Sequence, residues 1–275
     1  MKDIIQIAEL KALQPGSFVL IDATGGPTAA DSYSMEHLAQ AYYVNLEQDL
    51  SAIDNPAKGG RHPLPSPADF ASLLTSLGIQ KDTHVIVYDR LSGANAAARF
   101  WWMMKSIGHA NIQVLDGGFQ EAKRQGYPTA EGNPARTTED TKAYPAPSTW
   151  QLPTVSMETI SQWTEDTEPT LIVDVREEAR YQGLQEPIDL VAGHIPTAIN
   201  IPYAKNLNDS GLFKSSEELK DLYAPVIKDL SSNSSAIHCG SGVTACHTLL
   251  AIAIAGLALP SLYVGSWSEW SINKL

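Results

Sequence analysis

The sequence predicts an α/β protein with two domains of one fold, each a mainly parallel sheet with helices on both faces. Short apolar segments typical of buried strands alternate along the chain with longer segments of helical character. This order occurs twice, because strands expected at 18–22 and 84–89 correspond to strands expected at 170–174 and 234–239. A chain of 275 residues has room for two such domains.

The first domain is predicted to span residues 1–130. After its strand at 18–22, a helix is expected at 67–77, with proline near its start and glycine just past its end. The strand at 84–89 then leads through a glycine-containing loop into an apolar helix expected at 93–107. A further strand ends in a double-glycine turn that precedes a phenylalanine.

The second domain is predicted to span residues 154–275 and to repeat this order. A helix expected at 215–223 corresponds to the helix at 67–77, and an apolar helix is expected at 243–256 after the second strand. Between the domains, residues 131–153 are rich in proline and polar side chains and show no apolar periodicity. This segment is predicted to be a polar linker.

Composition and cysteine count narrow the possible functions. The formal net charge of −12 disfavours nucleic acid and anionic membranes as partners. The two cysteines, Cys239 and Cys246, match neither a redox pair nor a zinc site, so no metal or other cofactor is predicted. No disulfide and no signal peptide are expected, which favours a cytoplasmic protein. The apolar segment 249–259 is too short to span a bilayer.

Cys239 is the residue at which chemistry is expected. An apolar strand ends there, and Gly240, Ser241 and Gly242 follow before the next helix. Backbone N–H groups of such a loop converge on one point near a helix N-terminus, which predicts a lowered thiol pKa and a nucleophilic thiolate. A buried packing cysteine is the alternative, but it needs no glycine turn beside it. The first domain has Asp89 at the matching position, so it is predicted to be non-catalytic.

Several motifs extend over nearly the whole chain in a fixed order. They are GGRHPLP at 59–65, VLDGG at 114–118, DVR at 174–176 with RYQG at 180–183, AGHIPTAINIP at 192–202, CGSGVT at 239–244 and VGSWSEW at 264–270. Together they resemble the tandem-domain rhodanese-type sulfurtransferases. The resemblance implies two rhodanese-like domains and transfer of sulfur through a persulfide on Cys239.

The resemblance also implies which residues act beside the cysteine. In the family, a serine at the position of Ser241 works with a histidine and an acidic residue from the first domain. The matching histidine is His62. The acid falls on Glu47, where the family more often has aspartate, and Asp49 is the alternative.

The expected carboxylate clamp for the substrate consists of Arg180 and Arg176, because a guanidinium can hold a carboxylate with two parallel hydrogen bonds. Arg180 matches the family's substrate-contacting arginine best, and a partly structural role is an alternative for Arg176. Surface pairing of both arginines with nearby glutamates is the other alternative. The rest of the substrate site is expected to be formed by the loop residues Gly240, Gly242, Val243 and Thr244. Asp174 and His194 are expected to be structural and Cys246 to pack inside a helix, whereas Trp267 either lines the cleft or packs in the core.

The loop also bears on the choice of substrate. Thiosulfate-preferring members carry basic residues after the cysteine, whereas this loop is similar to that of members that use 3-mercaptopyruvate. The expected donor is therefore this small anion, and the acceptor is a thiol such as thioredoxin or glutathione, or cyanide. A thiosulfate:cyanide sulfurtransferase and a non-enzymatic sulfur carrier or regulatory module remain alternatives. A cysteine phosphatase would need an arginine at the end of the loop, where Ala245 stands.

Overall fold

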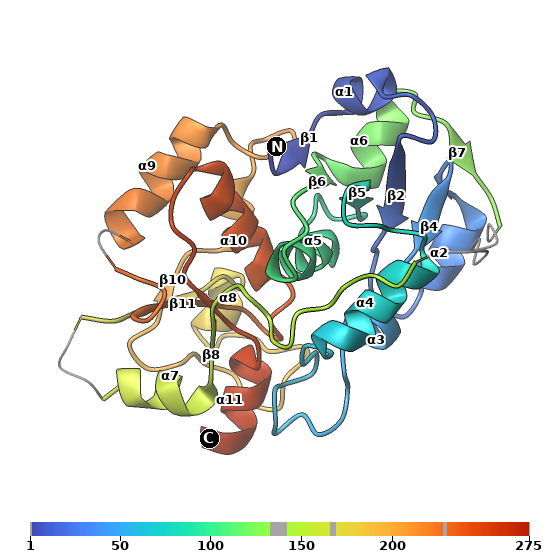
Figure 1. Cartoon of the computed structure of the whole chain (residues 1–275). Coiled ribbons are helices and arrows are strands. Elements are labelled where there is room, and N and C mark those ends of the chain that lie inside the picture. The colour runs from blue at the N-terminus through green and yellow to red at the C-terminus, as the bar shows by residue number, and fades with distance from the viewer. Residues whose placement is uncertain (1, 133–141, 166–168, 228–229, 275) are drawn as a thin grey trace. The chain divides into compact units, whose positions relative to one another are not determined.

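A computed structural model of the chain describes residues 2–132, 142–165, 169–227 and 230–274. The chain divides into two compact units, whose elements are labelled in Figure 1. Unit 1 comprises Met1–Ser51 and Pro65–Gln151, and unit 2 comprises Ala52–Leu64 and Leu152–Leu275. Within the described ranges, no helix is both long and apolar enough to cross a membrane.

Unit 1 is built on a five-stranded parallel sheet with the order β1-β6-β5-β2-β4. The strands are β1 (Ile4–Ile5), β2 (Phe18–Asp22), β4 (Ala41–Tyr43), β5 (His84–Tyr88) and β6 (Ile112–Leu115). The helices are α1 (Ile7–Ala12), α2 (Ala29–Met35), α3 (Leu46–Asp49), α4 (Pro67–Ser76), α5 (Ala97–Ser106) and α6 (Gly118–Arg124). A separate antiparallel pair joins β3 (His37–Leu38) to β7 (Thr129–Ala130). The strands predicted at 18–22 and 84–89 and the helix predicted at 67–77 are confirmed.

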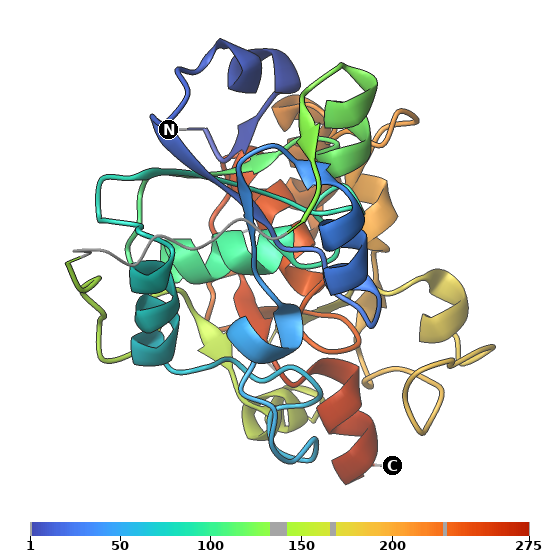
Figure 2. The ribbon, with the colours of Figure 1, turned by 90° about the vertical axis from the view of Figure 1, so that its right-hand side faces the viewer.

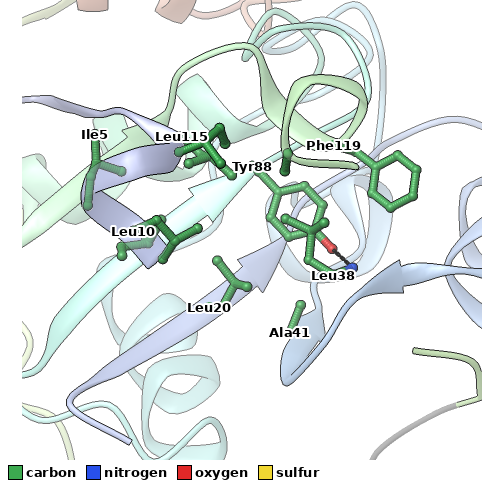
Figure 3. Packing of buried hydrophobic residues seen from close by; sticks show 11 residues of the cluster. Ile5, Leu10, Leu20, Leu38, Ala41, Tyr88, Leu115 and Phe119 are labelled. Atoms are coloured by element: carbon green, nitrogen blue, oxygen red, sulfur yellow. Dashed lines mark hydrogen bonds between the residues drawn. The ribbon is translucent and has the colours of Figure 1, made fainter. Parts of the chain in front are cut away.

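Helices α1 and α6 cover one face of this sheet. Leu20 and Tyr88 of adjacent strands pack there against Leu10 of α1 and Phe119 of α6, as Figure 3 shows. The Tyr88 hydroxyl accepts a hydrogen bond from the backbone N–H of Leu38 at 3.0 Å, which ties β3 to the core. The aromatic and aliphatic side chains on this face therefore hold the sheet and the flanking helices as one core.

The opposite face of the sheet is covered as well. Alternate side chains of a strand point to opposite faces, so Val85 and Val87 lie on the other side from Tyr88. Helix α5 contacts both β5 and β6, and α4 packs on α5 through the rings of Phe70 and Phe100, 5.5 Å apart. The predicted α/β fold with helices on both faces is confirmed for this unit.

Unit 2 repeats this plan with the strand order β10-β9-β11-β12-β8, again entirely parallel. The strands are β8 (Thr154–Val155), β9 (Leu171–Asp174), β10 (Ile199–Asn200), β11 (Ser235–His238) and β12 (Ser261–Tyr263). The helices are α7 (Met157–Trp163), α8 (Glu178–Tyr181), the 3₁₀ helix η1 (Tyr203–Asn206), α9 (Ser216–Ile227), α10 (Ala245–Ile254) and α11 (Ser266–Lys274). The helix predicted at 215–223 therefore continues to Ile227, and the apolar helix predicted at 243–256 is confirmed as α10.

The core of unit 2 is rich in tryptophan. Trp163 of α7 and the two α11 residues Trp267 and Trp270 pack with Ile172 of β9 and Tyr263 of β12. On the α10 side, this helix contacts β11, α9 and η1. Because β11 lies in the middle of the sheet, the residue that follows it leaves the sheet at its centre.

The segment Ala52–Leu64 belongs to unit 2, although it lies within the sequence range predicted for the first domain. It runs beside α11, as Figures 1 and 2 both show. Asn273 Nδ2 donates to the Ala57 carbonyl at 3.0 Å, and the Gly59 N–H donates to Glu269 Oε1 at 2.6 Å. Contacts between residues far apart in the sequence therefore join this segment to unit 2.

The segment predicted as a linker, 131–153, is described only in part, because residues 133–141 lie outside the described ranges. Its later part packs on unit 1. Tyr144 is buried, and its hydroxyl oxygen lies 2.9 Å from His109 Nδ1. The Trp150 ring packs against the rings of Phe70 and Trp102. Large aromatic side chains thus join this polar segment to the core of the unit.

Candidate active site

Cys239 directly follows β11, at the carboxyl end of the central strand of unit 2. Its side chain is buried, with 3% of the residue exposed. The loop 240–244 leads from it into α10, which begins at Ala245. The predicted strand, loop and helix around the cysteine are therefore confirmed, and the carboxyl edge of a parallel sheet is a usual place for a ligand site.

The start of α11 fixes the backbone of this loop. The Cys239 N–H donates to Ser266 Oγ at 3.1 Å, and its carbonyl accepts from the Trp267 N–H at 3.0 Å. The carbonyl of Gly240 accepts from the Ser268 N–H at 2.9 Å. The serine-rich motif that precedes the last helix thus serves to position the cysteine loop.

Gly242 is required by both backbone and space. It adopts a φ of +73°, and a Cβ atom there would lie 2.4 Å from the carbonyl oxygen of Val264. We expect Gly242→Ala to lower the free energy of unfolding by more than the roughly 1–2 kcal/mol that a left-handed residue costs. We also expect it to lower any activity that depends on Cys239 by at least about tenfold, because the loop must move.

Gly256→Ala is the matched control for this prediction. Gly256 has a similar φ of +70°, but no atom lies within 4 Å of its Cβ position. Urea denaturation of both variants therefore separates the cost of the backbone conformation from the cost of the clash. Equal losses of stability and activity in the two variants would contradict the requirement for close approach at Gly242.

The loop that follows β5 in unit 1 corresponds to the cysteine loop, and its backbone N–H groups bind a carboxylate. The Asp89 carboxylate, fully buried after β5, accepts five backbone N–H hydrogen bonds of 2.8–3.1 Å. The donors are Leu91, Gly93, Asn95, Ala96 and Ala97. Burial raises the pKa of the Asp89 carboxyl, and the backbone N–H groups oppose this rise. The convergent N–H groups form an anion-binding nest, which also explains why α5 begins at Ala97 and not at the predicted residue 93.

The corresponding loop of unit 2 has no carboxylate of its own. Among the described residues, the backbone N–H groups of Gly240, Ser241, Val243 and Thr244 have no hydrogen-bond acceptor. The thiol of Cys239 stands at the sequence position that the Asp89 carboxylate occupies in unit 1. The loop therefore offers backbone N–H groups to an anion beside Cys239.

The structure brings His62 and Ser241 together. His62 Nδ1 lies 2.8 Å from Ser241 Oγ, and Ser241 is only 7% exposed. The histidine is held in place by its segment, because the Arg61 N–H donates to Ser268 Oγ at 3.0 Å. A Cβ at Gly60 would lie 2.4 Å from the Gly265 carbonyl oxygen, so the segment lies very close to the turn before α11.

Glu47 and Asp49 both lie on α3 of unit 1. Asp49 Oδ2 accepts a hydrogen bond from the Asn45 N–H at 2.8 Å, and the Glu47 N–H donates to Asn45 Oδ1 at 2.9 Å. These contacts cap the short helix. The choice between the two acids as the partner of His62 stays a prediction.

Arg176 is enclosed by protein partners, and its role in substrate binding stays a prediction. Its side chain is only 1% exposed. Its nitrogens donate to the Asp174 carboxylate at 2.6–3.1 Å, to the Gly193 carbonyl at 2.7 Å and to Glu186 at 3.3 Å. Its guanidinium also lies over the ring of Trp267, 4.7 Å from the centroid. Arg176 is a buried structural cation whose partners already use its donors.

Arg180 occupies a different environment. Its Nε and Nη2 donate to Glu186 at 3.2 and 2.6 Å, and Nη2 also lies 3.3 Å from Asp189 Oδ2. The pairing with Glu186 that formed the alternative interpretation is thus present. The guanidinium nevertheless faces the cysteine loop, because Nη1 lies 3.6 Å from the Cβ position of Gly240. Arg180 pairs with acids on one side and borders the loop on the other.

The two acids around Arg180 have different electrostatic environments. Burial opposes ionisation of Glu186, but the Arg180 hydrogen bond and the N–H groups of Asp189 and Ile188 hold its pKa below the usual value. Burial raises the pKa of Asp189, and the charge of Arg61 opposes that rise. Glu186 is therefore the firm anchor of Arg180, whereas Asp189 is a carboxylate shared by Arg61 and Arg180.

Arg61 is a residue that the sequence analysis missed. It pairs with Asp189 Oδ1 through Nη1, and its Nη2 lies 3.2 Å from the Cβ position of Gly240. The only signal for it was its place beside His62 in the motif GGRHPLP. Its placement could not be foreseen, because nothing local in the sequence shows that this segment packs on the second unit.

The remaining predicted residues have structural roles. Trp267 is fully buried and donates through Nε1 to the Val191 carbonyl at 2.9 Å, which settles its role as core packing. Cys246 is buried in α10, and its Sγ atom lies 3.4 Å from the Gly242 carbonyl oxygen. His194 Nδ1 lies 2.8 Å from the Tyr181 carbonyl oxygen, and its ring stacks on Tyr181. Across the described ranges, no cluster of three His, Cys, Asp or Glu side chains is arranged to hold a metal ion.

Comparison with known proteins extends these findings. A family model described as the rhodanese-like domain matches residues 6–125 and again residues 156–273. The chain is 36% identical over 255 residues to a probable 3-mercaptopyruvate sulfurtransferase of Pseudomonas aeruginosa, covering 92% of this chain and 86% of that one. It is 34% identical over 245 residues to a thiosulfate sulfurtransferase of Gallus gallus, covering 88% and 81% of the two chains.

A solved structure agrees with these likenesses. The 3-mercaptopyruvate sulfurtransferase from Leishmania major matches with a TM-score of 0.84 at 29% identity, covering 98% of this chain and 74% of that one. Each unit has the parallel sheet expected from the alternation of strands and helices, and the cysteine loop follows the central strand of one of these sheets. The chain, with its two rhodanese-like domains, therefore belongs to the rhodanese family of sulfurtransferases.

Proposed function

We propose that the protein is a 3-mercaptopyruvate sulfurtransferase in which Cys239 carries the transferred sulfur as a persulfide. The observation that supports this donor best is the pair formed by Ser241 Oγ and His62 Nδ1, 2.8 Å apart. Ser241 stands two residues after the nucleophile, in a loop without lysine or arginine. Relatives are named for both 3-mercaptopyruvate and thiosulfate, so the chemistry of the site has to decide between the donors.

The first half-reaction forms the persulfide. The Cys239 thiolate attacks the donor sulfur, an S–S bond forms, and the C–S bond of 3-mercaptopyruvate breaks. The electron pair of that bond passes into the enolate of pyruvate, which takes one proton to become pyruvate. The Ser241 hydroxyl, hydrogen-bonded to His62, is the group that supplies this proton. His62 then restores the serine proton.

The cysteine loop stabilises the sulfur anion both before and after sulfur transfer. The Asp89 nest of unit 1 supports this role, because five N–H groups of the corresponding loop bind one carboxylate there. The N–H groups of Gly240, Val243 and Thr244 would face the thiolate before transfer and the persulfide after it. Unit 1 is non-catalytic in this proposal, because its nest already holds its own carboxylate.

Arg180 contributes to donor binding beside the loop, and Glu186 keeps it in place. Glu47 or Asp49 is proposed as the acid that sets the orientation of His62. In the second half-reaction, an acceptor thiolate attacks the outer sulfur and releases the Cys239 thiolate. The acceptor is a thiol such as thioredoxin or glutathione, or cyanide. Neither cysteine forms a disulfide among the described residues, and the cytoplasm is the proposed location.

Thiosulfate is the second candidate donor, and one observation favours it. Two guanidinium groups, those of Arg61 and Arg180, border the loop from outside its own sequence. A dianion gains more from two cations than a singly charged carboxylate does, because the attraction scales with the charge. Thiosulfate releases sulfite, however, which needs no proton to leave, so the Ser241–His62 pair would have no task with this donor.

This difference provides the test. We expect kcat/KM for 3-mercaptopyruvate to exceed that for thiosulfate by at least about tenfold. We expect Ser241→Ala to lower the value for 3-mercaptopyruvate by about 10²-fold and that for thiosulfate by less than about threefold. The measurements are steady-state kinetics of the wild type and Ser241→Ala with both donors, together with mass spectrometry of the Cys239 persulfide.

Other outcomes identify the alternatives. A higher kcat/KM for thiosulfate, unaffected by Ser241→Ala, would assign the protein as a thiosulfate:cyanide sulfurtransferase. Failure to form a persulfide from either donor would instead favour a non-enzymatic module.

A further inference from the structure

The loop that follows α8 exposes large apolar side chains to solvent. The two most exposed such residues in the described ranges, Leu190 and Leu184, both belong to it and are 88% and 76% exposed. Ile188 is 58% exposed and Val191 is 37% exposed. Single exposed apolar side chains are common, but four within eight residues indicate an interaction surface. We call these four residues the apolar rim.

The acidic residues of the same loop point inward. The side chains of Glu186 and Asp189 are each only 4% exposed. Glu186 Oε1 accepts from the N–H groups of Ile188 and Asp189, both at 3.1 Å, and from Arg180 Nη2 at 2.6 Å. In an ordinary surface loop, charged side chains face water and apolar ones are covered. This loop has the reverse arrangement, so its fold itself presents the apolar rim.

The loop is held in one shape. Its two ends meet, because a Cβ atom at Gly183 would lie 3.3 Å from the backbone nitrogen of Gly193, as in a closed Ω-loop. The Val191 carbonyl accepts from Trp267 Nε1 at 2.9 Å, and the Gly193 carbonyl accepts from Arg176 Nη2 at 2.7 Å. A surface that is already ordered loses little conformational entropy when a partner binds.

The same contacts connect the apolar rim to the nucleophile. Trp267, whose indole binds the Val191 carbonyl, donates its backbone N–H to the Cys239 carbonyl at 3.0 Å. Arg180, which both acids of the loop bind, has its Nη1 atom 3.6 Å from the Cβ position of Gly240. The apolar rim therefore belongs to a loop that borders the entrance to the cysteine.

We propose that the apolar rim docks a protein acceptor whose reactive thiol is surrounded by apolar surface. This inference rests on the proposed function and concerns its second half-reaction. Cys239 is only 3% exposed, so a protein thiol can reach it only if the surface around that thiol rests on residues bordering the cysteine loop. The acceptor thiolate then bonds to the outer sulfur, the S–S bond on Cys239 breaks, and its electron pair leaves as the Cys239 thiolate.

The chemistry of the loop favours a protein over other occupants. Cyanide and glutathione are small, charged acceptors that gain little from exposed aliphatic side chains. Residues 181–193 include no lysine or arginine, and the net charge of the chain is −12. A membrane-binding loop usually combines apolar side chains with cations that bind lipid headgroups. A protein surface with an apolar patch is therefore the occupant that suits this loop best.

The test isolates the second half-reaction. The protein is first converted to its persulfide with 3-mercaptopyruvate, and the loss of the persulfide from Cys239 is then followed by mass spectrometry with excess reduced thioredoxin or excess cyanide. In the double variant Leu184→Ser, Leu190→Ser, we expect the second-order rate constant for thioredoxin to fall by about 10- to 100-fold. The rate constant for cyanide should change by less than about twofold, and the urea midpoint should stay close to that of the wild type, because both side chains are exposed.

Two control variants make this result specific to apolar contact at the loop. Changing Leu184 and Leu190 together to methionine keeps two flexible apolar side chains and should preserve most of the rate with thioredoxin. Met35→Ser removes another exposed apolar side chain, on α2 of unit 1, where the residue is 67% exposed. It should leave the rates with both acceptors unchanged.

The outcomes separate this inference from the proposed function. An unchanged rate with thioredoxin in the serine double variant would overturn the docking assignment, and an equal loss with cyanide would mean that the loop only shapes the site. Transfer from the wild type to cyanide but not to thioredoxin would also overturn it, with the proposed function intact.

The remaining outcomes concern other occupants. If the serine changes abolished binding to phosphatidylcholine vesicles, or self-association in sedimentation, but left the rate with thioredoxin unchanged, the apolar rim would belong to a membrane contact or to a second copy of this chain. Failure of the wild type to form a persulfide from 3-mercaptopyruvate would contradict the proposed function. A persulfide made with thiosulfate would then allow the same comparison of acceptors.

Discussion

Cys239→Ser is expected to lower sulfur transfer by more than about 10³-fold, because the variant loses the nucleophile itself. A serine hydroxyl at this position ionises far less readily than a thiol and cannot form a persulfide. The backbone of the loop should keep its geometry, since its contacts to Ser266, Trp267 and Ser268 involve main-chain groups of the loop. We therefore expect the free energy of unfolding to change by less than about 2 kcal/mol.

Cys246→Ser is the control within the same unit. Cys246 is as deeply buried as Cys239, but it lies in α10 with its sulfur 3.4 Å from the Gly242 carbonyl oxygen. A serine hydroxyl can donate to the same oxygen, so most of the activity should remain. The measurement is the rate of pyruvate release with the mass of the protein followed in parallel. Persulfide on Cys239→Ser, or its absence from Cys246→Ser, would show that the chemistry has been assigned to the wrong cysteine.

The sequence could predict the fold because its strands are local features. Runs such as 18–22 and 170–174 are apolar, end at an acidic residue and pair in parallel in both units. The internal repeat also allowed Asp89 to be matched with Cys239. That match correctly predicted an N–H-lined loop, which the five hydrogen bonds to Asp89 confirm for unit 1.

The sequence could not predict which unit a surface segment joins. Residues 52–64 have no strong periodicity, and they are joined to unit 2 by contacts such as those from Gly59 to Glu269 and from Arg61 to Ser268. Contacts between residues so far apart in the chain leave no local signature. His62 was found only through a family motif, and Arg61 beside it was missed for the same reason.

The two arginines of the predicted clamp illustrate the same limit. Arg176 and Arg180 are four residues apart and both stand in family motifs, and Arg180 is the better match, but the sequence does not show how deeply either side chain is buried. Arg176 follows the end of β9 directly, where the buried Asp174 carboxylate binds it. Arg180 is one helical turn further on, at the edge of the cysteine loop. The difference in burial between the enclosed Arg176 and the more exposed Arg180 appears only in three dimensions.

We therefore expect Arg176→Ala to destabilise the protein strongly. The substitution removes a cation that is 1% exposed and leaves the carboxylates of Asp174 and Glu186, which are 0% and 4% exposed, without it. Breaking a buried ion pair in this way typically costs about 3–5 kcal/mol, because the remaining charge is not compensated. The cation–π contact with Trp267 is lost as well. The quantity to measure is the free energy of unfolding from urea denaturation.

Arg180→Ala and a double variant make this prediction specific. Arg180 is more exposed, and Glu186 would keep its contact with Arg176, so Arg180→Ala should cost much less stability and mainly raise KM for 3-mercaptopyruvate. Adding Asp174→Asn to Arg176→Ala removes one of the uncompensated charges and should recover part of the lost stability. If Arg176→Ala were as stable as the wild type and only its KM for 3-mercaptopyruvate rose, the side chain would have to leave its buried contacts to bind the donor. Arg176 would then share the carboxylate site, and the division of labour between a structural and a ligand-binding arginine would be wrong.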